Sequence, residues 1–120
     1  MAIALVGIAG AAGDPRGTWK FNYYYGGNTY THDMMITSFN PETGEFKGNG
    51  WDSDNPAITW DVSGISQING WKIEFHIDYT GEDPDYWVDA TGNFPSDTFM
   101  LGTAKAPGQS AEWDATKIAA

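Results

Sequence analysis

Residues 71–80 read WKIEFHIDYT, and this stretch decides the fold. Apolar and polar side chains alternate through it without interruption. The apolar side chains stand at every second position: Trp71, Ile73, Phe75, Ile77 and Tyr79. Because successive side chains of a strand point to opposite faces, the alternation predicts a strand with one face in a core and the other in water.

The same pattern recurs in seven further segments, which we expect to be strands. They are residues 18–25, 29–39, 45–51, 57–65, 85–94, 98–105 and 109–118. Short turns rich in Gly, Pro, Asn and Asp separate them, and short links make consecutive strands antiparallel neighbours. Closing such a meander removes its two exposed edges. We therefore predict an all-β domain over residues 15–120, an eight-stranded antiparallel up-and-down β-barrel, with a two-sheet β-sandwich as the alternative.

The predicted inner face is rich in large rings. It comprises Trp19, Phe21, Tyr23, Met34, Ile36, Phe46, Ile58, Trp60, Val62, Trp71, Ile73, Phe75, Ile77, Tyr86, Val88, Phe99, Leu101 and Trp113. The interior of an eight-stranded barrel is just wide enough to be filled by side chains or to hold one small ligand. So many rings favour a filled core over an open cup.

Residues 1–14, MAIALVGIAGAAGD, form an apolar N-terminal arm rich in small residues. The arm is either a strand that docks on this barrel or on a neighbour, or the remnant of a leader. It has no positively charged beginning and is shorter than a usual signal peptide. We favour docking.

Composition excludes several classes of function. Sixteen acidic residues against six basic ones give a net charge of −10, which disfavours binding to nucleic acid and to anionic membrane surfaces. The chain has no cysteine, so it forms no disulfide and no cysteine-ligated zinc site. No apolar run reaches the roughly 20 residues of a membrane span. We predict no cofactor.

The opening Gly17-Thr18-Trp19 resembles the G-x-W of the calycins, the lipocalin and avidin superfamily. The motifs TGEFKG at 43–48 and WDATK at 113–117 are similar in outline to the avidin branch. The resemblance implies a barrel in which Trp19 plugs one end and the other end binds a small apolar or cyclic ligand. Two departures matter. Arg16 is the chain's single arginine, so no later arginine covers the Trp, and the biotin-holding set of avidins is matched at most by Asn22 and Tyr23. Residues 36–48 are also similar to Gly- and aromatic-rich β modules of surface proteins of unassigned role.

A ligand cup would have its polar fringe near the first hairpin. Its candidate ligand-binding residues are Tyr23, Tyr25, Tyr30, His32, Trp60 and Trp71. His32 is the inward-facing base on which a small barrel enzyme could depend. Spacing suggests no nucleophile for it, so we favour a half-buried histidine bonded to its surroundings over a catalyst.

Two acidic loops offer hard oxygens to calcium, through Asp52, Asp54, Asp83 and Asp85. Neither loop has the spacing of an EF-hand, and calcium takes six to eight oxygen ligands. Solvated turn acids are the favoured interpretation, and we predict no metal.

Large apolar residues also fall on the predicted outer face, including Met35, Trp51, Trp87, Met100 and Phe39. Such patches often mark contacts between subunits, although a bulge could turn some of these residues inward. The expected assembly contacts are Ile3, Leu5, Val6, Ile8, Met35, Trp51 and Trp87.

The favoured function is a non-enzymatic structural or interaction module. It would self-associate or decorate a larger particle or surface (a virion, a fibre or a cell surface), which favours an extracellular, cell-surface or virion-associated location. The alternative is a calycin-like protein that binds a small hydrophobic ligand, and a more distant one is an enzyme using His32 and nearby tyrosines.

Overall fold

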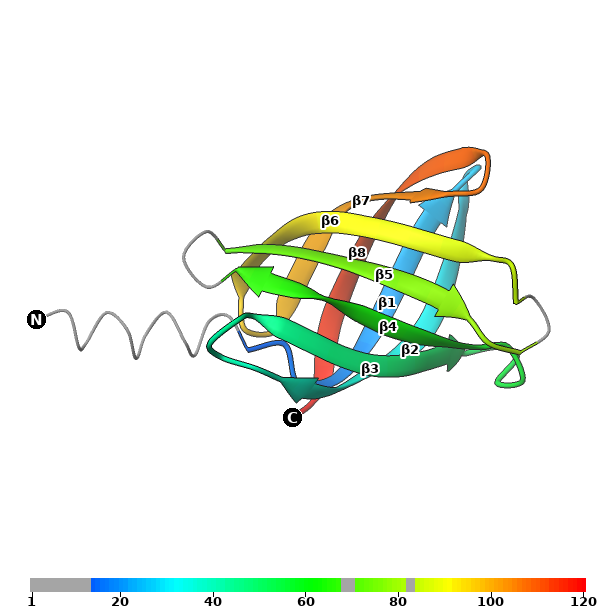
Figure 1. Ribbon diagram of the computed structural model, residues 1–120. Helices are drawn as coiled ribbons and strands as arrows, with labels where there is room; N and C mark the ends of the chain where they lie inside the picture. Colours follow the sequence, from blue (N-terminus) through cyan, green and yellow to red (C-terminus); the bar gives the residue numbers. More distant parts are fainter. Residues whose placement is uncertain (1–13, 68–70, 82–83) are drawn as a thin grey trace, which may run out of the picture.

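The computed structural model describes residues 14–67, 71–81 and 84–120. The expected contacts of the arm, Ile3, Leu5, Val6 and Ile8, lie outside the described residues, as does Asp83. Eight strands follow one another along the chain (Figure 1). They are β1 Gly17–Tyr25, β2 Asn28–Phe39, β3 Glu45–Asp52, β4 Thr59–Gln67, β5 Lys72–Tyr79, β6 Trp87–Ser96, β7 Phe99–Ala106 and β8 Gln109–Ala119. Within these residues no helix has the length and apolar character needed to cross a bilayer.

The strands close into one antiparallel barrel in sequence order, which confirms the predicted barrel over the sandwich. The closing pair joins β1 to β8, where Phe21 faces Ala115 and Tyr23 faces Trp113. No strand end differs from its predicted position by more than two residues. Alternation along each segment and short turns were therefore enough to place every strand.

One end of the barrel, which we call the plug end, is closed by Trp19. Its indole is fully buried, and its Nε1 donates a hydrogen bond to the carbonyl oxygen of Pro15 at 2.9 Å. The ring meets Phe94 edge to face at a centroid distance of 5.9 Å. Lys117 Nζ lies 5.3 Å from the centroid of the Trp19 ring. A lysine of β8 therefore covers Trp19 in this chain, which has no later arginine to do so. Figure 1 shows the β1–β2 and β7–β8 turns at the opposite end of the barrel.

The middle of the barrel is filled by packed rings. Trp113 contacts Phe21 and Phe75 at centroid distances of 5.8 and 5.1 Å, and Phe75 meets Phe46 at 6.3 Å. The indole Nε1 of Trp113 donates to the carbonyl oxygens of Thr91 and Thr103, at 3.2 and 3.0 Å. The filled core that the sequence predicted therefore occupies the centre and the plug end.

The phase of β7 was predicted wrongly. Met100 is fully buried and Leu101 is exposed, whereas the sequence placed Leu101 inside and Met100 outside. The inward positions of β7 after Met100 are small, Gly102 being one, and they leave room for the indole of Trp113, which pairs with Gly102. The two phases carry similar apolar character, so hydrophobicity alone could not choose between them.

Trp71 was also placed wrongly. It stands before β5 with a φ of 54° and is 44% exposed instead of facing the core. Its carbonyl oxygen accepts a hydrogen bond from the backbone N–H of Phe94 at 2.7 Å, at the plug end. The left-handed backbone breaks the alternation one residue before the strand begins, and turns the indole outward.

Candidate functional site: an aromatic cup

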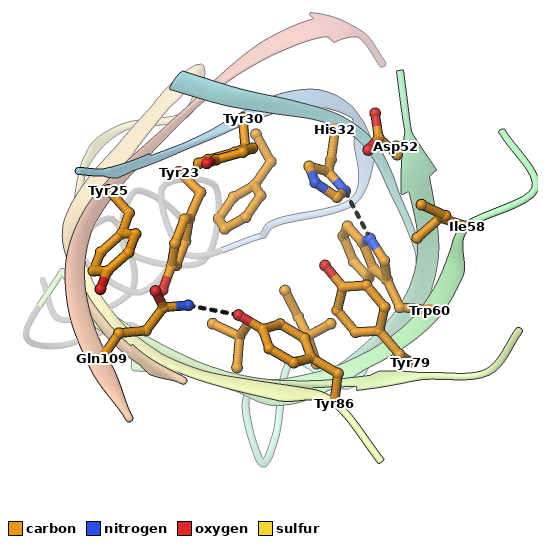
Figure 2. A pocket seen from close by; sticks show the side chains of 13 residues that line it. Tyr23, Tyr25, Tyr30, His32, Asp52, Ile58, Trp60, Tyr79, Tyr86 and Gln109 are labelled. Carbon is orange, nitrogen blue, oxygen red and sulfur yellow. Dashed lines mark hydrogen bonds between the residues drawn. The ribbon is translucent and has the colours of Figure 1, made fainter. Parts of the chain in front are cut away.

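The end of the barrel opposite Trp19 opens into a cavity of about 330 Å³, which we call the cup. Figure 2 shows its side chains converging from around the barrel wall. The lining residues are Phe21, Tyr23, Tyr25, Tyr30, His32, Asp52, Ile58, Trp60, Ile77, Tyr79, Tyr86, Val88 and Gln109.

The cup has an apolar floor and a polar rim. Phe21, Ile77 and Val88 are buried and lie nearest the filled centre of the barrel. Tyr25 and Tyr30, which flank the β1–β2 turn, are among the more exposed large side chains of the described residues. A bound molecule would thus find hydrocarbon and ring surface below and hydroxyl groups above.

On the wall of the cup, Trp60 Nε1 donates a buried hydrogen bond to His32 Nδ1 at 3.0 Å. Gly50 makes this bond geometrically feasible. It pairs with Trp60 across β3 and β4, and a Cβ at position 50 would stand 2.4 Å from Cη2 and Cζ2 of the indole. The indole lies over the bare glycine backbone and reaches His32 on β2.

The bond to Trp60 fixes the protonation of His32. Because Nδ1 accepts, the neutral imidazole carries its proton on Nε2. Burial lowers the pKa of His32, against the opposing pull of the Asp52, Asp33 and Asp54 carboxylates, so the ring is neutral near pH 7. Figure 2 shows the second ring nitrogen on the side facing the cup interior, where it offers an N–H donor.

Tyr23 brings a polar group into the cup that the fold does not satisfy. The residue is 8% exposed, and its hydroxyl is buried without a hydrogen-bond partner among the described residues. Burial, followed by the neighbouring Tyr86 and Tyr25, raises the pKa of Tyr23, so the phenol stays protonated. Buried hydroxyls are nearly always paired, and leaving one unpaired costs about 1–3 kcal/mol.

The rim is held by contacts between loops and strands. Gln109 Nε2 donates to the Tyr86 hydroxyl at 2.6 Å (Figure 2), and the rings of Tyr79 and Tyr86 meet edge to face at 5.0 Å. The backbone N–H of Tyr79 also bonds the carbonyl oxygen of Tyr86 at 3.1 Å. The loop before β6 is thereby attached to β5 and β8.

Asp52 places a carboxylate on the same rim. It ends β3 directly opposite His32, so both side chains point inward. Its Oδ1 accepts a hydrogen bond from the backbone N–H of Asp54 at 2.8 Å, and its own N–H bonds the carbonyl oxygen of Ile58 at 3.0 Å. No group of three or more His, Cys, Asp or Glu placed to hold a metal occurs in the part of the chain described; Asp83 lies outside that part.

The structure brings five of the six predicted ligand-binding residues together, namely Tyr23, Tyr25, Tyr30, His32 and Trp60. Trp71 does not join them, because it lies at the plug end. Tyr86 and Ile58 line the cup, as their inner-face assignment would place them, and Asp52 lines it although the sequence singled it out only for calcium. Gln109 was missed: a polar residue at a strand start carries no signal that distinguishes a rim from a solvated turn.

The described lining contains no Ser, Thr or Cys side chain, so His32 has only tyrosine hydroxyls as neighbouring hydroxyl groups within the cup.

On the outer wall, Met35 and Trp51 lie on the adjacent strands β2 and β3, with Met35 37% exposed. Trp87 lies three strands further on β6, stacked on His76 at a centroid distance of 6.4 Å. The predicted outer assembly residues therefore form two separate surfaces. Phe39 packs against the core instead of joining them.

No family model and no curated protein matches the sequence. Among solved structures the chain is similar to designed β-barrels. The redesigned barrel mFAP1 bound to DFHBI shares 16% identity at a TM-score of 0.66, over 89% of this chain and 97% of that one. Another redesigned β-barrel shares 19% sequence identity at a TM-score of 0.69, over 89% of this chain and 93% of that one. A fluorescence-activating β-barrel designed de novo shares 17% sequence identity at a TM-score of 0.64, over 85% of this chain and 92% of that one. At such identities the likeness is one of fold.

Proposed function

We propose that this protein binds a small organic molecule in the cup. The observation that carries the proposal is the buried Tyr23 hydroxyl, which has no partner among the described residues and stands in the wall of an aromatic cavity. A protein built only for stability gains nothing from this hydroxyl, because phenylalanine would fill the same space without the penalty. A ligand that forms a hydrogen bond with the Tyr23 hydroxyl offsets the free-energy cost of burying that hydroxyl without a partner.

The dimensions and chemistry of the cup fit this role. Small-molecule sites are concave and mostly apolar, with a few polar groups that fix orientation, and they span roughly 300–1,000 Å³. The cup, at about 330 Å³, lies at the small end of that range. It suits one compact ring system, whose apolar part rests on Phe21, Ile77 and Val88. His32 Nε2–H and the Tyr23 hydroxyl would orient its polar atoms.

The barrel also has a precedent for ligand binding in one solved neighbour. mFAP1, with which this chain shares its fold, has been solved bound to DFHBI. The sequence resemblance to calycins implies an open end with the same kind of role, opposite the Trp19 plug. Both likenesses support the proposal, and neither identifies the ligand.

A titration of Trp fluorescence tests the proposal. Trp60 lines the cup, so a panel of small ring compounds should change the emission of the wild-type protein in a saturable way. Tyr23→Phe should weaken the response of ligands that bond the hydroxyl. Tyr24→Phe is the matched control, because the neighbouring Tyr24 faces outward and bonds Asp114. No saturable response from any panel member, or equal effects of the two variants, would contradict binding in the cup.

A second candidate function is assembly through the outer wall. It is favoured by Met35 and Trp51, large apolar residues at diagonal positions on the outer face of the adjacent strands β2 and β3. The expected result is a concentration-dependent mass in native mass spectrometry that Met35→Lys abolishes. A protein that stays monomeric at every concentration would contradict this candidate and leave the cup unaffected.

A further inference from the structure

The described lining of the cup carries one charged side chain, and that side chain is acidic. Asp52 is the one acidic side chain among the described lining residues, and that lining contains no Lys or Arg. His32 does not offset it, because its Nδ1 accepts the Trp60 hydrogen bond and the ring is uncharged in that state. The cup therefore has a net negative charge, located at its rim.

The aromatic groups reinforce this polarity. Tyr25, Tyr30, Tyr79 and Tyr86 stand around the same rim as Asp52. The faces of aromatic rings are electron-rich and attract cations, and the attraction grows when the cation loses part of its water. Rings and a carboxylate at one level of a cavity form a favourable site for a substituted ammonium group.

The rest of the chain points the same way. Four of the six basic residues, Arg16, Lys47, Lys72 and Lys117, lie toward the plug end by their positions along or just before their strands. Lys20 is paired with Asp33 at 2.5 Å. The sixth basic residue, Lys105, stands near the cup end of β7, where it is exposed on the outer wall and does not line the cup. The chain as a whole, with a net charge of −10, attracts cations and repels anions, and the described lining of the cup adds a carboxylate and no basic side chain.

The order of the groups sets the orientation of the ligand. Charge stands at the rim, and hydrocarbon at the floor is provided by Phe21, Ile77 and Val88. A molecule that matches this order enters with its apolar end first and keeps its cationic group at the mouth. A lysine side chain of another protein would have to enter with its charge first, so it does not match.

We infer, building on the ligand-binding role proposed above, that the cup takes a free amphipathic organic cation, an aryl or alkyl body carrying a substituted ammonium group. The ammonium lies at the rim between Asp52 and the tyrosine rings, and the apolar body rests on the floor.

Three probes of the same shape separate charge from hydrophobicity. They are benzyltrimethylammonium, its uncharged carbon analogue neopentylbenzene, and phenylmethanesulfonate as the anion. Each is titrated by Trp fluorescence against the wild type, Asp52→Asn and the control Asp97→Asn. The control removes the same charge from an exposed turn at the plug end.

Asp52→Asn should weaken binding of the cation roughly five- to tenfold, given a charge separation of a few ångströms at a partly solvated site. It should leave the neutral probe within about twofold and strengthen the anion, while Asp97→Asn changes none of the three appreciably. In the wild type, rising salt should weaken the cation and leave the neutral probe unchanged, a readout that does not depend on how the variant folds.

The possible failures are distinguishable. Equal effects of Asp52→Asn on cation and neutral probe, or salt-independent cation binding, would overturn the charge inference while ligand binding stands. Binding of a trimethyllysine peptide as tight as that of benzyltrimethylammonium would overturn the assigned orientation. Absence of saturable binding for all three probes would overturn the cation inference alone, because the proposed function is tested by the wider ligand panel and by Tyr23→Phe.

Discussion

Tyr23→Phe should make the ligand-free protein more stable, which is unusual for a change at a residue that is 8% exposed. The substitution keeps the ring and its packing and removes one buried oxygen that has no partner among the described residues. An unpaired buried polar group costs about 1–3 kcal/mol, so the free energy of unfolding should rise by a similar amount. For a domain of 120 residues this corresponds to roughly 3–6 °C in melting temperature per kcal/mol.

Tyr24→Phe is the matched control on the same strand. The Tyr24 hydroxyl donates to Asp114 Oδ2 at 2.7 Å on the outer face, in an exposed setting. Removing it deletes a made bond instead of an unmade one, so stability should fall by at most about 1 kcal/mol. The two changes are chemically identical, and only the surroundings of the hydroxyl differ.

The assay is urea unfolding of wild type and both variants without ligand, followed by fluorescence and circular dichroism. The midpoint should move up for Tyr23→Phe and down for Tyr24→Phe, with unchanged slopes. A destabilised Tyr23→Phe would show that the hydroxyl already has a partner in the folded protein. It would remove the observation on which the proposed ligand binding depends.

Three further predictions concern the pH dependence and the packing of the barrel. The pKa of His32 is lowered in the folded protein, so the unfolded chain binds a proton at this histidine first as the pH falls below about 6.5. The urea midpoint of the wild type should therefore fall below that pH, and the midpoint of His32→Gln should fall less. The pKa of the His76 side chain is raised, chiefly by its hydrogen bond to Asp89. Its small contribution to the stability of the folded state should therefore be complete below about pH 6.5 and lost as the pH rises through the folded pKa. His76→Gln should remove the part of the difference between the urea midpoints at pH 6 and pH 9 that this histidine causes. Gly50→Ala places a Cβ against the Trp60 indole and should lower the free energy of unfolding, measured with urea, by about 1–3 kcal/mol. It should also lower the affinity of any ligand that binds in the cup. An unchanged unfolding curve would show that the indole can move at no cost.

Most of the fold was predictable from local patterns. Residues 71–80 alternate so regularly that β5 follows from them alone, and short polar turns leave consecutive strands no choice but antiparallel pairing. Closure was the natural solution for eight such strands, since an open sheet would leave two edges unpaired. Trp71 and β7 were the exceptions, where a left-handed backbone and small inward residues removed the signal.

The candidate site was predictable only as a region. Tyr25 and Tyr30 flank a hairpin turn on the inward phase, so the sequence alone places them at one end of the barrel. The bond from Trp60 to His32 joins β4 to β2 across the bare backbone of Gly50, a relation that depends on register and side-chain reach.

The sequence by itself determined which residues form strands and which face of most strands meets the core, because both depend on nearest neighbours along the chain. Beyond the Trp19 plug, which the resemblance to calycins had implied, only the tertiary structure decided that the opposite end is hollow, that Asp52 stands over the cup, and that the Tyr23 hydroxyl is left unpaired among the described residues. These facts depend on the barrel's register and on how rings from distant strands share a confined volume, and no pattern of period two contains that information.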